Sequence, residues 1–405
     1  MGPVDPSAMR RLNIASTLRA VYDNGPIATG PLQSLTGLSR RTLEVIINDL
    51  AAQGWIDDTV PTASSKRGAG RPARSLSFNW QAGYVAAVQL DFGYMIAQLA
   101  DLSGSPVSER RSDLSNALSR EDRIAHLFNE VDLLLTEAAV ERGHVLAVAV
   151  ATPGIVRDNG TIDLPATFLD WSDFPLRSRL EEGFDCPVQV ENDSNLAALG
   201  EVALAGEDPD ANFIWVRADG VRIGLGIVIN GQLYRGADGA AGEIVWAPAL
   251  NFEAVQDHVL SGLVHPDHPR SQEAHEIIRL SREGDAMALA EIDSLAAGMA
   301  PGLQTLAWIL APQEIVIGGV LGTLDHLLVD ALGRRLFAQP HPVEARLRTS
   351  ASSERAIIAG AIQTALGAVK RTLFSGLDLQ SAPIVRQKTV TGDVPHNETV
   401  SARSV

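Results

Sequence analysis

The chain has 405 residues, of which 45% are hydrophobic, and this is enough to build two or three domains with sizeable cores. Its one cysteine, Cys186, excludes a disulfide within the chain and a zinc site built from thiolates. The first residues lack the pattern of a signal peptide, and no apolar run is long enough to cross a bilayer, so we expect a cytoplasmic protein without membrane contact.

The net charge of −16 is unevenly distributed along the chain. Residues 1–80 contain nine Lys and Arg against six Asp and Glu, whereas the remaining residues contain 24 against 43. A basic N-terminal segment on a strongly acidic body confines any contact with a polyanion to that segment.

The first 80 residues have the pattern of three helices followed by a hairpin. Apolar residues at helical spacing predict helices over residues 10–24, 30–36 and 39–54. A strand is expected to begin at residue 55, with residues 75–78 as its partner. Two helices joined by a tight glycine-containing turn and followed by a hairpin are typical of a winged helix-turn-helix.

Two groups of residues in this segment are candidates for contact with double-stranded operator DNA. The start of the third helix would face bases and phosphates in the major groove, and the hairpin tip is basic and contains no acid. The candidates are Ser39, Arg40, Arg41 and Thr42 on the helix, and Lys66, Arg67, Arg71 and Arg74 on the tip. The alternative is a module that contacts protein and carries an ordinary solvated basic loop.

From Tyr84 onward the pattern changes to that of an α/β domain. Strands are expected over residues 84–90, 95–101, 145–150, 188–190, 212–216, 224–229 and 314–317, and helices over residues 120–142, 175–182, 196–205 and much of 271–310 and 320–374. Asn230-Gly231 predicts a tight hairpin turn. The polar residues from about 380 onward are expected to be disordered.

One strand-to-helix junction carries the polar residues on which a ligand site can be built. Val188–Val190 alternates like a strand, Leu196–Ala205 is apolar and helix-forming, and Asn192–Asn195 lies between them. In open α/β proteins ligands collect where strands end and helices begin, and a carboxylate there can bind a ligand hydroxyl or take its proton. A structural role is the alternative, because Asp193 or Ser194 has the residue type of a helix N-cap.

These motifs resemble those of the ROK family, which groups sugar-sensing repressors and sugar kinases. The resemblance covers about residues 10–375 and rests on the order and spacing of several short motifs. They are Thr152-Pro-Gly-Ile-Val156, Glu191-Asn-Asp-Ser-Asn195 with Ala198-Leu-Gly-Glu201, Ile229-Asn-Gly-Gln-Leu-Tyr-Arg-Gly236, Ala241-Gly-Glu243, Ile317-Gly-Gly319 and Gly70-Arg-Pro72.

The resemblance implies an α/β fold in which an N-terminal winged helix-turn-helix precedes an actin-like, two-lobed ROK domain of the sugar kinase and ribonuclease H-like type. The winged helix-turn-helix would occupy residues 1–80. The ROK domain would occupy residues 81–378, with its two lobes divided near residue 195, and residues 379–405 would form a disordered tail.

Departures from the family's motifs argue against an enzyme. Tyr94 replaces a small glycine and Met95 replaces a hydroxyl residue in the first phosphate loop, and Arg222 replaces the first of three spaced glycines in the second. Phosphoryl transfer depends on positioning, so two altered loops predict no kinase activity and no cofactor. Trp246 stands where the family's zinc site has a histidine, and no cysteine follows, so we expect no metal.

Other family positions imply a site for a sugar or phosphosugar effector. Asn192, Asp193 and Glu243 match hydroxyl-binding positions, Thr167 replaces an asparagine, and Asp257 replaces a glutamate. The resemblance therefore implies a transcriptional regulator, most simply a repressor of carbohydrate uptake or catabolism genes. A homodimer or homotetramer is expected, because paired DNA half-sites match two-fold symmetry. Two alternatives stay open: a sugar kinase with a regulatory head, and an effector-independent DNA-binding protein with a degenerate kinase body.

Overall fold

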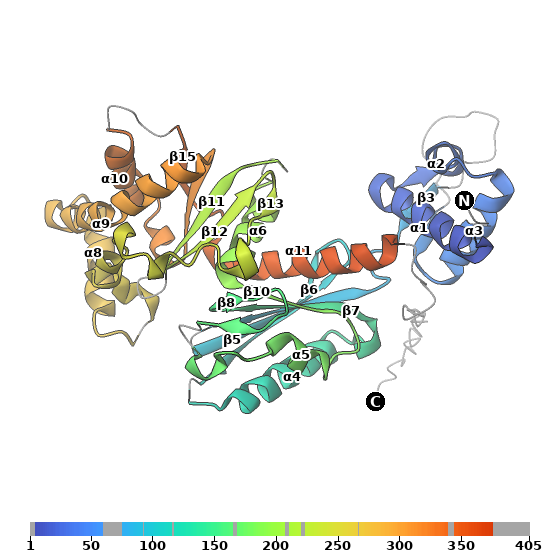
Figure 1. Ribbon diagram of the computed structural model, residues 1–405, viewed down its shortest axis with the longest axis horizontal. Helices are drawn as coiled ribbons and strands as arrows, with labels where there is room; N and C mark the ends of the chain where they lie inside the picture. Colours follow the sequence, from blue (N-terminus) through green and yellow to red (C-terminus); the bar gives the residue numbers. More distant parts are fainter. Residues whose placement is uncertain are drawn as a thin grey trace, which may run out of the picture.

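The computed structural model describes residues 5–59, 75–91, 93–115, 117–164, 168–206, 210–219, 223–265, 267–338 and 344–375. These residues form a small N-terminal head and two lobes, each built on a five-stranded sheet (Figure 1). The long helix α11 (Ser353–Phe374) packs on the first of these sheets and reaches the head.

The head consists of three helices and a three-stranded antiparallel sheet. The helices α1 (Pro6–Asn24), α2 (Thr29–Thr36) and α3 (Arg40–Ala52) bury Leu18, Leu32 and Leu43 completely. The strands β1 (Ile27–Ala28), β3 (Ser75–Phe78) and β2 (Ile56–Thr59) lie side by side in that order.

The head's helices and the β2–β3 pair lie close to their predicted positions, and two differences are local. The helix α1 starts earlier than predicted, at Pro6, because the side chain of Asp5 accepts a hydrogen bond from the N–H of Ser7 and caps it. The two-residue strand β1 was not predicted, because two residues carry no periodic pattern. The hairpin tip, residues 61–74, lies outside the described residues.

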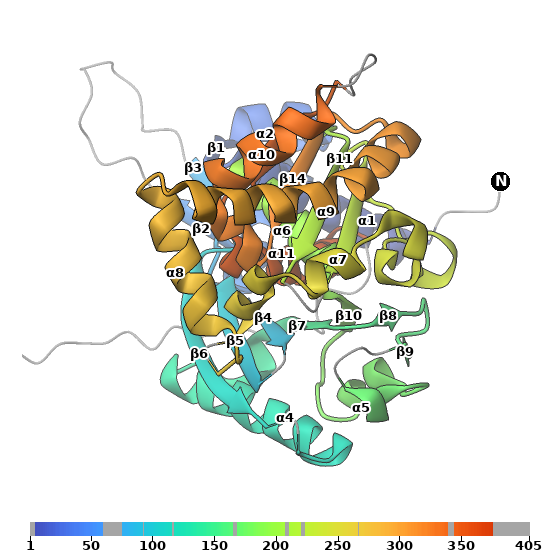
Figure 2. The ribbon, with the colours of Figure 1, turned by 90° about the vertical axis from the view of Figure 1, so that its left-hand side faces the viewer.

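The first lobe is built on a mixed sheet with strands in the order β10-β7-β4-β5-β6. The strands β4, β5 and β6 are antiparallel neighbours, whereas β7 and β10 add in parallel on the other side. Helices α4 and α5 cover one face (Figure 2). The elements are β4 (Tyr84–Leu90), β5 (Gly93–Asp101), β6 (Pro106–Leu114), α4 (Arg120–Glu137), η1 (Arg142–His144), β7 (Val145–Thr152), β8 (Ile155–Val156), β9 (Ile162–Asp163), η2 (Leu169–Trp171), α5 (Leu176–Glu181) and β10 (Val188–Asn192).

The second lobe repeats this arrangement with strands in the order β13-β12-β11-β14-β15. Three consecutive strands are again antiparallel neighbours, and the last two add in parallel. The elements are β11 (Phe213–Ala218), β12 (Ile223–Ile229), β13 (Gln232–Leu233), η3 (Ala237–Gly239), η4 (Ile244–Trp246), η5 (Pro248–Leu250), α7 (Glu253–Gln256), η6 (Val259–Val264), α8 (Ser271–Arg282), α9 (Ala286–Leu310), β14 (Glu314–Gly318), η7 (Val320–Leu324), α10 (His326–Leu336) and β15 (Arg346–Thr349). The predicted two-lobed α/β body is therefore confirmed.

Two helices are exchanged between the lobes. The helix α6 (Asp193–Ala205) follows β10 of the first lobe but packs on β11 and β12 of the second. Conversely, α11 follows β15 of the second lobe but packs on β4 and β7 of the first. The contact between α6 and α11 is consequently the main connection between the lobes.

The two helices cross at Gly200 and Gly360. A Cβ atom on Gly200 would lie 1.8 Å from the carbonyl oxygen of Ala356, and a Cβ atom on Gly360 would lie 1.8 Å from that of Leu196. Glycine is the residue that allows two backbones to approach this closely. The side chain of Glu201, fully buried next to the crossing, accepts hydrogen bonds that tie α6 to the segment leading into α11.

The far end of α11 contacts the head through an aromatic cluster of Tyr22, Phe78, Trp80 and Phe374. The ring of Tyr22 has its centroid 5.4 Å from that of Phe374, 5.1 Å from that of Phe78 and 5.0 Å from that of Trp80. The Nζ atom of Lys370 lies 5.0 Å from the centre of the Tyr22 ring. One helix thus touches both the lobes and the head.

Within the described ranges, every helix is too short or too polar to span a lipid bilayer.

We expect Gly200→Ala to destabilise the protein, although alanine is the better helix former. Helix propensity favours alanine by about 1 kcal/mol, but the new methyl group would overlap the carbonyl oxygen of Ala356, and overpacking costs about 1–3 kcal/mol or more. Thermal unfolding should therefore show a Tm several degrees below that of the wild type. Gly30→Ala in α2 is the control, because a Cβ atom there meets nothing within 4 Å, and its Tm should be equal or higher. An unchanged Tm for Gly200→Ala would contradict the close crossing.

Candidate functional site

Asn192 ends β10 and caps α6. Its Oδ1 accepts hydrogen bonds from the N–H groups of Ser194 (2.8 Å) and Asn195 (3.1 Å), and its Nδ2 donates to the carbonyl oxygen of Gly154 (2.9 Å). The alternative in which Asp193 or Ser194 caps the helix is therefore wrong. Because Asn192 satisfies the exposed N–H groups, the carboxylate of Asp193 is available for another partner.

That partner is Arg217, and both residues belong to a buried group of charges. The guanidinium donates through Nη1 to Asp193, through Nε to Asp219 and through Nη2 to Asp91 at 3.0 Å. Arg217 is 4% exposed, and the three carboxylates are buried as well. Burial alone would lower the pKa of Arg217, but the negative charges of Asp193, Asp219 and Asp91 raise that pKa well above its usual value. We refer to Arg217, Asp91, Asp193 and Asp219 as the Arg217 cluster.

The Arg217 cluster connects the two lobes. Asp91 follows β4 in the first lobe, Arg217 and Asp219 lie at the end of β11 in the second, and Asp193 starts α6. Arg217 was not predicted as a site residue, although one charged residue in the otherwise apolar strand Phe213–Ala218 was a usable signal. A buried charge costs several kcal/mol unless it is paired, so such an arginine indicates carboxylates nearby.

The region of the first phosphate loop is filled by side chains. The Oη of Tyr94 donates a hydrogen bond to Asp91 at 3.0 Å, and the Nε2 of Gln89 donates to the same carboxylate oxygen at 3.3 Å. Met95 is buried, and the guanidinium of Arg111 lies 4.1 Å from the centre of the Tyr94 ring. Tyr94 thus adds a donor to the Arg217 cluster.

The second phosphate loop is only partly described, because Arg222 lies outside the described residues. Gly224 and Gly226 lie in β12, directly against the start of α6. A Cβ atom on Gly224 would lie 2.3 Å from the Oγ of Ser194, and one on Gly226 would lie 2.4 Å from its carbonyl oxygen. These glycines allow α6 to begin next to β12, which keeps Asp193 close to Arg217.

Glu191 holds the surrounding loops in place. Its Oε1 accepts a hydrogen bond from Asn195 at 3.1 Å, and its Oε2 accepts one from Arg235 at 2.7 Å. Arg235 also donates to the carbonyl oxygen of Val156 (2.8 Å) and pairs with Asp158. These motif residues therefore position the backbone around the start of α6.

Glu243 lies half-buried near the Arg217 cluster. It follows Gly242, which has a φ of 95° and on which a Cβ atom would lie 2.0 Å from the carbonyl oxygen of Leu225. Burial and the negative charge of Asp193 raise the pKa of Glu243 to about 7. The structure thus brings Glu243 close enough to Asp193 for the two carboxyl groups to interact electrostatically.

The other two predicted ligand residues are Thr167 and Asp257. Thr167 lies outside the described residues. Asp257 is exposed at the C-terminal end of α7, where its carbonyl oxygen accepts a hydrogen bond from Arg270 at 2.6 Å. In the described residues, no ion pair or hydrogen bond joins the carboxylate of Asp257 to Asn192, Asp193 or Glu243.

Trp246 and His258 lie near the chain position where the resemblance would have implied a zinc site. Trp246 is 62% exposed at the end of η4. The Nδ1 of His258 accepts a hydrogen bond from the N–H of Leu260 (3.2 Å), its Nε2 lies 3.6 Å from Glu291, and burial lowers its pKa. In the part of the chain that the structure describes, no group of three or more His, Cys, Asp and Glu side chains is arranged to hold a metal ion.

The predicted DNA-contacting helix exposes its first turn. The Oγ of Ser39 accepts a hydrogen bond from the N–H of Thr42 (3.2 Å) and caps α3. Arg40 pairs with Glu44 at 3.0 Å, but both side chains are exposed, so the pair contributes little to stability and is readily exchanged. Arg41 and Thr42 are exposed as well. Lys66, Arg67, Arg71 and Arg74 lie outside the described residues.

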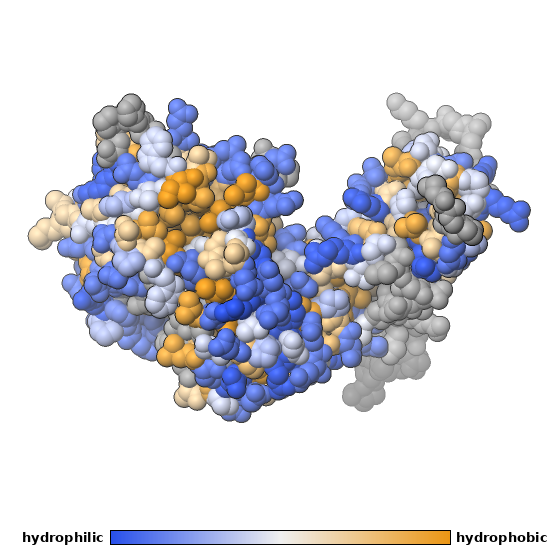
Figure 3. Space-filling model, viewed as in Figure 1, coloured by the Kyte–Doolittle hydropathy of each residue, from blue (hydrophilic) through white to orange (hydrophobic). Residues whose placement is uncertain are grey.

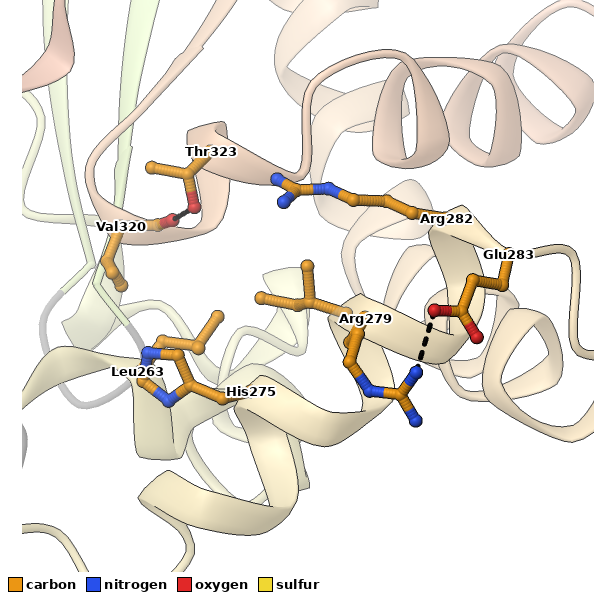
Figure 4. A pocket seen from close by; sticks show the side chains of 8 residues that line it. Leu263, His275, Arg279, Arg282, Glu283, Val320 and Thr323 are labelled. Atoms are coloured by element: carbon orange, nitrogen blue, oxygen red, sulfur yellow. Dashed lines mark hydrogen bonds and ion pairs between the residues drawn. The ribbon is translucent and has the colours of Figure 1, made fainter.

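A separate cavity of about 580 Å³ lies in the second lobe between α8, η6 and η7 (Figure 4). Its lining consists of Leu263, His275, Ile278, Arg279, Arg282, Glu283, Val320 and Thr323. Arg279 pairs with Glu276 (2.6 Å) and Glu283 (2.7 Å). The N–H of Val320 donates to Asp219 at 2.6 Å, so η7 contacts both the cavity and the Arg217 cluster. This cavity was not predicted from the sequence, because its lining comes from three separate segments.

Comparison with known proteins places these features in a family context. The sequence profile of the ROK family matches residues 94–255 and 247–367. A xylose repressor of Caldicellulosiruptor bescii is 24% identical over 87% of this chain and 95% of its own. A solved ROK family transcriptional regulator, a homologue of the E. coli MLC protein, matches with a TM-score of 0.66 and 20% identity over 93% of this chain and 99% of its own. A ROK family glucokinase from Streptomyces griseus in complex with glucose and AMPPNP matches with a TM-score of 0.55 and 24% identity over 70% of this chain and 99% of its own.

We expect the protonation of Glu243 to make stability depend on pH near neutrality. Its pKa rises from the usual 4.5 to about 7 on folding, so its stabilising contribution is complete below pH 4.5 and is lost as the pH rises through 7. Between pH 5 and pH 8 the free energy of unfolding of the wild type should therefore fall by about 1–3 kcal/mol relative to that of Glu243→Gln, which cannot ionise. Thermal unfolding of both proteins across this range measures the difference. Glu253→Gln, at an exposed position on α7, is the control, and a Glu243→Gln curve parallel to the wild type would contradict the assignment.

Proposed function

The chain belongs to the ROK family, and we propose that it is a DNA-binding transcriptional repressor of carbohydrate uptake or catabolism genes. A sugar or phosphosugar effector would control it, and it would have no kinase activity. One observation carries this proposal: α11 joins a head with an exposed basic helix start to a body with a buried polar site between two lobes. The similarity to a xylose repressor over most of both chains supports it.

DNA contact is assigned to residues 1–80 as a winged helix-turn-helix. The turn between α2 and α3 contains Gly37, with a φ of 66°, and α3 exposes Arg40, Arg41 and Thr42 immediately after it. The first residues of a recognition helix are those that reach base edges in the major groove. The four basic residues of the hairpin tip would add phosphate contacts.

Effector binding is assigned to residues 81–378, at the junction between β10 and α6. Asp193 and Glu243 supply carboxylate oxygens, which form stronger hydrogen bonds to hydroxyl groups than neutral acceptors do. Asn192 adds an amide at the same junction. A related fold was solved with glucose bound, which supports a sugar as the class of ligand.

Assembly as a homodimer or homotetramer follows from the mode of DNA binding. A single small head buries little DNA surface, and two heads related by a two-fold axis match paired half-sites. The second lobe exposes apolar side chains that a neighbouring copy could cover, among them Trp308 (57% exposed) and Ile309 (71% exposed). Figure 3 shows apolar residues gathered on this lobe.

A second candidate is a sugar kinase with a regulatory head. It is favoured by Asp193 at the start of α6 and by the likeness to the fold of a glucokinase. Hexose-dependent formation of ADP would distinguish it from the proposed repressor. An effector-independent DNA-binding protein is the third candidate, and the absence of any ligand-induced rise in Tm would favour it.

We expect Arg41→Ala to weaken operator binding by about 10- to 100-fold, equivalent to about 1–3 kcal/mol, because an exposed arginine at the start of α3 would read a base edge. Gel shifts with a genomic fragment selected by the wild-type protein measure the affinity. Arg282→Ala is the matched control, since Arg282 is exposed at the end of α8 in the second lobe. Equal affinities of wild type and Arg41→Ala would contradict the assignment of α3.

We expect Asp193→Asn to lower the affinity for the effector by about 10- to 100-fold, because a charge-assisted hydrogen bond contributes about 1.5–3 kcal/mol. Calorimetry with a panel of pentoses, hexoses and their phosphates measures this. Asp257→Asn is the control: its carboxylate is exposed on α7, and its affinity should equal that of the wild type. Operator binding by the ligand-free variants should be retained. Equal binding by Asp193→Asn would show that Asp193 does not contact the ligand.

A further inference from the structure

Arg217 gives the body a fixed positive charge at the point where its two lobes meet. All three kinds of guanidinium nitrogen are used: Nε with Asp219, Nη1 with Asp193 and Nη2 with Asp91. Arginine suits this position because its planar group donates in several fixed directions and keeps its charge when buried. The strand β11 of the second lobe is thereby linked to the end of β4 in the first.

The carboxylates of the Arg217 cluster receive further hydrogen bonds from the protein. The Oδ1 of Asp219, which does not face Arg217, accepts a hydrogen bond from the N–H of Val320. The Oδ1 of Asp193 likewise accepts one from the Oγ of Ser194 at 3.1 Å. The oxygen of Asp91 that faces Arg217 also accepts Tyr94 and Gln89. Donors of the chain itself therefore contact both oxygens of Asp193 and Asp219 and one oxygen of Asp91.

A metal-bound nucleotide does not fit this arrangement. Nucleotide-dependent phosphoryl transfer uses a divalent cation that bridges phosphate and carboxylate oxygens. Arg217 already faces one oxygen of each of Asp91, Asp193 and Asp219, so a cation bound among these carboxylates would place its two positive charges beside that of Arg217. Repulsion between like charges in a buried site is costly.

We infer that Arg217 is a positioning residue that takes the place of a metal-bound nucleotide between the lobes and holds the ligand site assembled without either. This inference rests on the proposed function in taking the region around Asp193 as a ligand site. It adds that Arg217 blocks the region where a kinase would hold a metal-bound nucleotide. The ion pairs of Arg217 with three carboxylates would hold the two lobes together there instead. Without Arg217, three buried carboxylates would repel one another, and a divalent cation is the simplest species that could neutralise them.

The experiment compares full-length wild type, Arg217→Met and Arg217→Lys, with Arg279→Met as the matched control. Arg279 also lies between two carboxylates, but those of Glu276 and Glu283 belong to the same helix and its C-cap and are exposed. Each protein is titrated with Mn²⁺ while free Mn²⁺ is followed by electron paramagnetic resonance. Melting temperatures are recorded in EDTA, with Mn²⁺ and with Mg²⁺-ADP.

We expect wild type and Arg279→Met to bind no Mn²⁺ at micromolar concentration and to keep their Tm with Mg²⁺-ADP. Arg217→Met should melt several degrees lower in EDTA, recover most of this loss with Mn²⁺, and bind about one ion per chain. If Arg217 had a purely structural role, Arg217→Met would melt at a lower temperature and Mn²⁺ would not restore its Tm. Binding of Mn²⁺ with recovery of the Tm therefore distinguishes the two roles. Arg217→Lys keeps the charge but cannot reach three carboxylates, so its Tm should lie between those of wild type and Arg217→Met.

Three outcomes would overturn the inference: a rise in the wild-type Tm with Mg²⁺-ADP, a folded Arg217→Met that Mn²⁺ does not stabilise, or an Arg217→Lys as stable as the wild type. If Arg217→Met does not yield folded protein, the wild-type and Arg217→Lys measurements decide. None of these readouts involves DNA or sugar. A protein that fails to bind operator but gives the expected metal results would refute the proposed function and leave the role of Arg217 standing.

Discussion

The structure depends on the close crossing of α6 and α11 at Gly200 and Gly360. Each helix follows the last strand of one lobe and packs on the sheet of the other, so the two sheets are held together through this pair. Backbone contact without intervening side chains leaves no room for either helix to rotate or slide by small steps. The start of α6, where Asp193 lies, and the end of α11, which meets the head, are therefore fixed relative to one common point.

The repeated topology of the lobes explains why the polar site forms where it does. In both sheets the parallel strands end on the side where their exchanged helix begins, and ligands of α/β proteins collect at such ends. Asp91 follows a central strand of the first sheet, and Arg217 ends the matching strand of the second. The symmetry thus brings chain segments from both lobes together, and the Arg217 cluster is the chemical result.

Much of this could be predicted from the sequence, because strands and helices depend on local patterns. The strand-to-helix junction at Asn192–Asn195 and the Ala241-Gly-Glu243 motif were visible in the sequence, and both lie at the site. The polar edge strand β6 was missed because its half-exposed side chains lack an apolar alternation. Arg217 was missed because its partner Asp91 lies 126 residues away, and a single sequence does not record such pairing.

An effector can shift this protein between two forms only by binding them unequally. The crossing of α6 and α11 is held by close backbone contacts at Gly200 and Gly360, so the packing there would change least between the two forms. The Arg217 cluster can supply a difference in affinity between the two forms, because its ion pairs join residues of separate lobes. A ligand on Asp193 would compete directly with Arg217 for that carboxylate. Any change in the angle between the lobes must then turn about the crossing. It would reach the head through α11, whose last turn touches Tyr22 by ring contact and has no buried ion pair there among the described residues. A change at the effector site could reach the head in this way, because the helix crossing is fixed, the ion pairs of the Arg217 cluster can rearrange, and the aromatic contact at Tyr22 is non-directional.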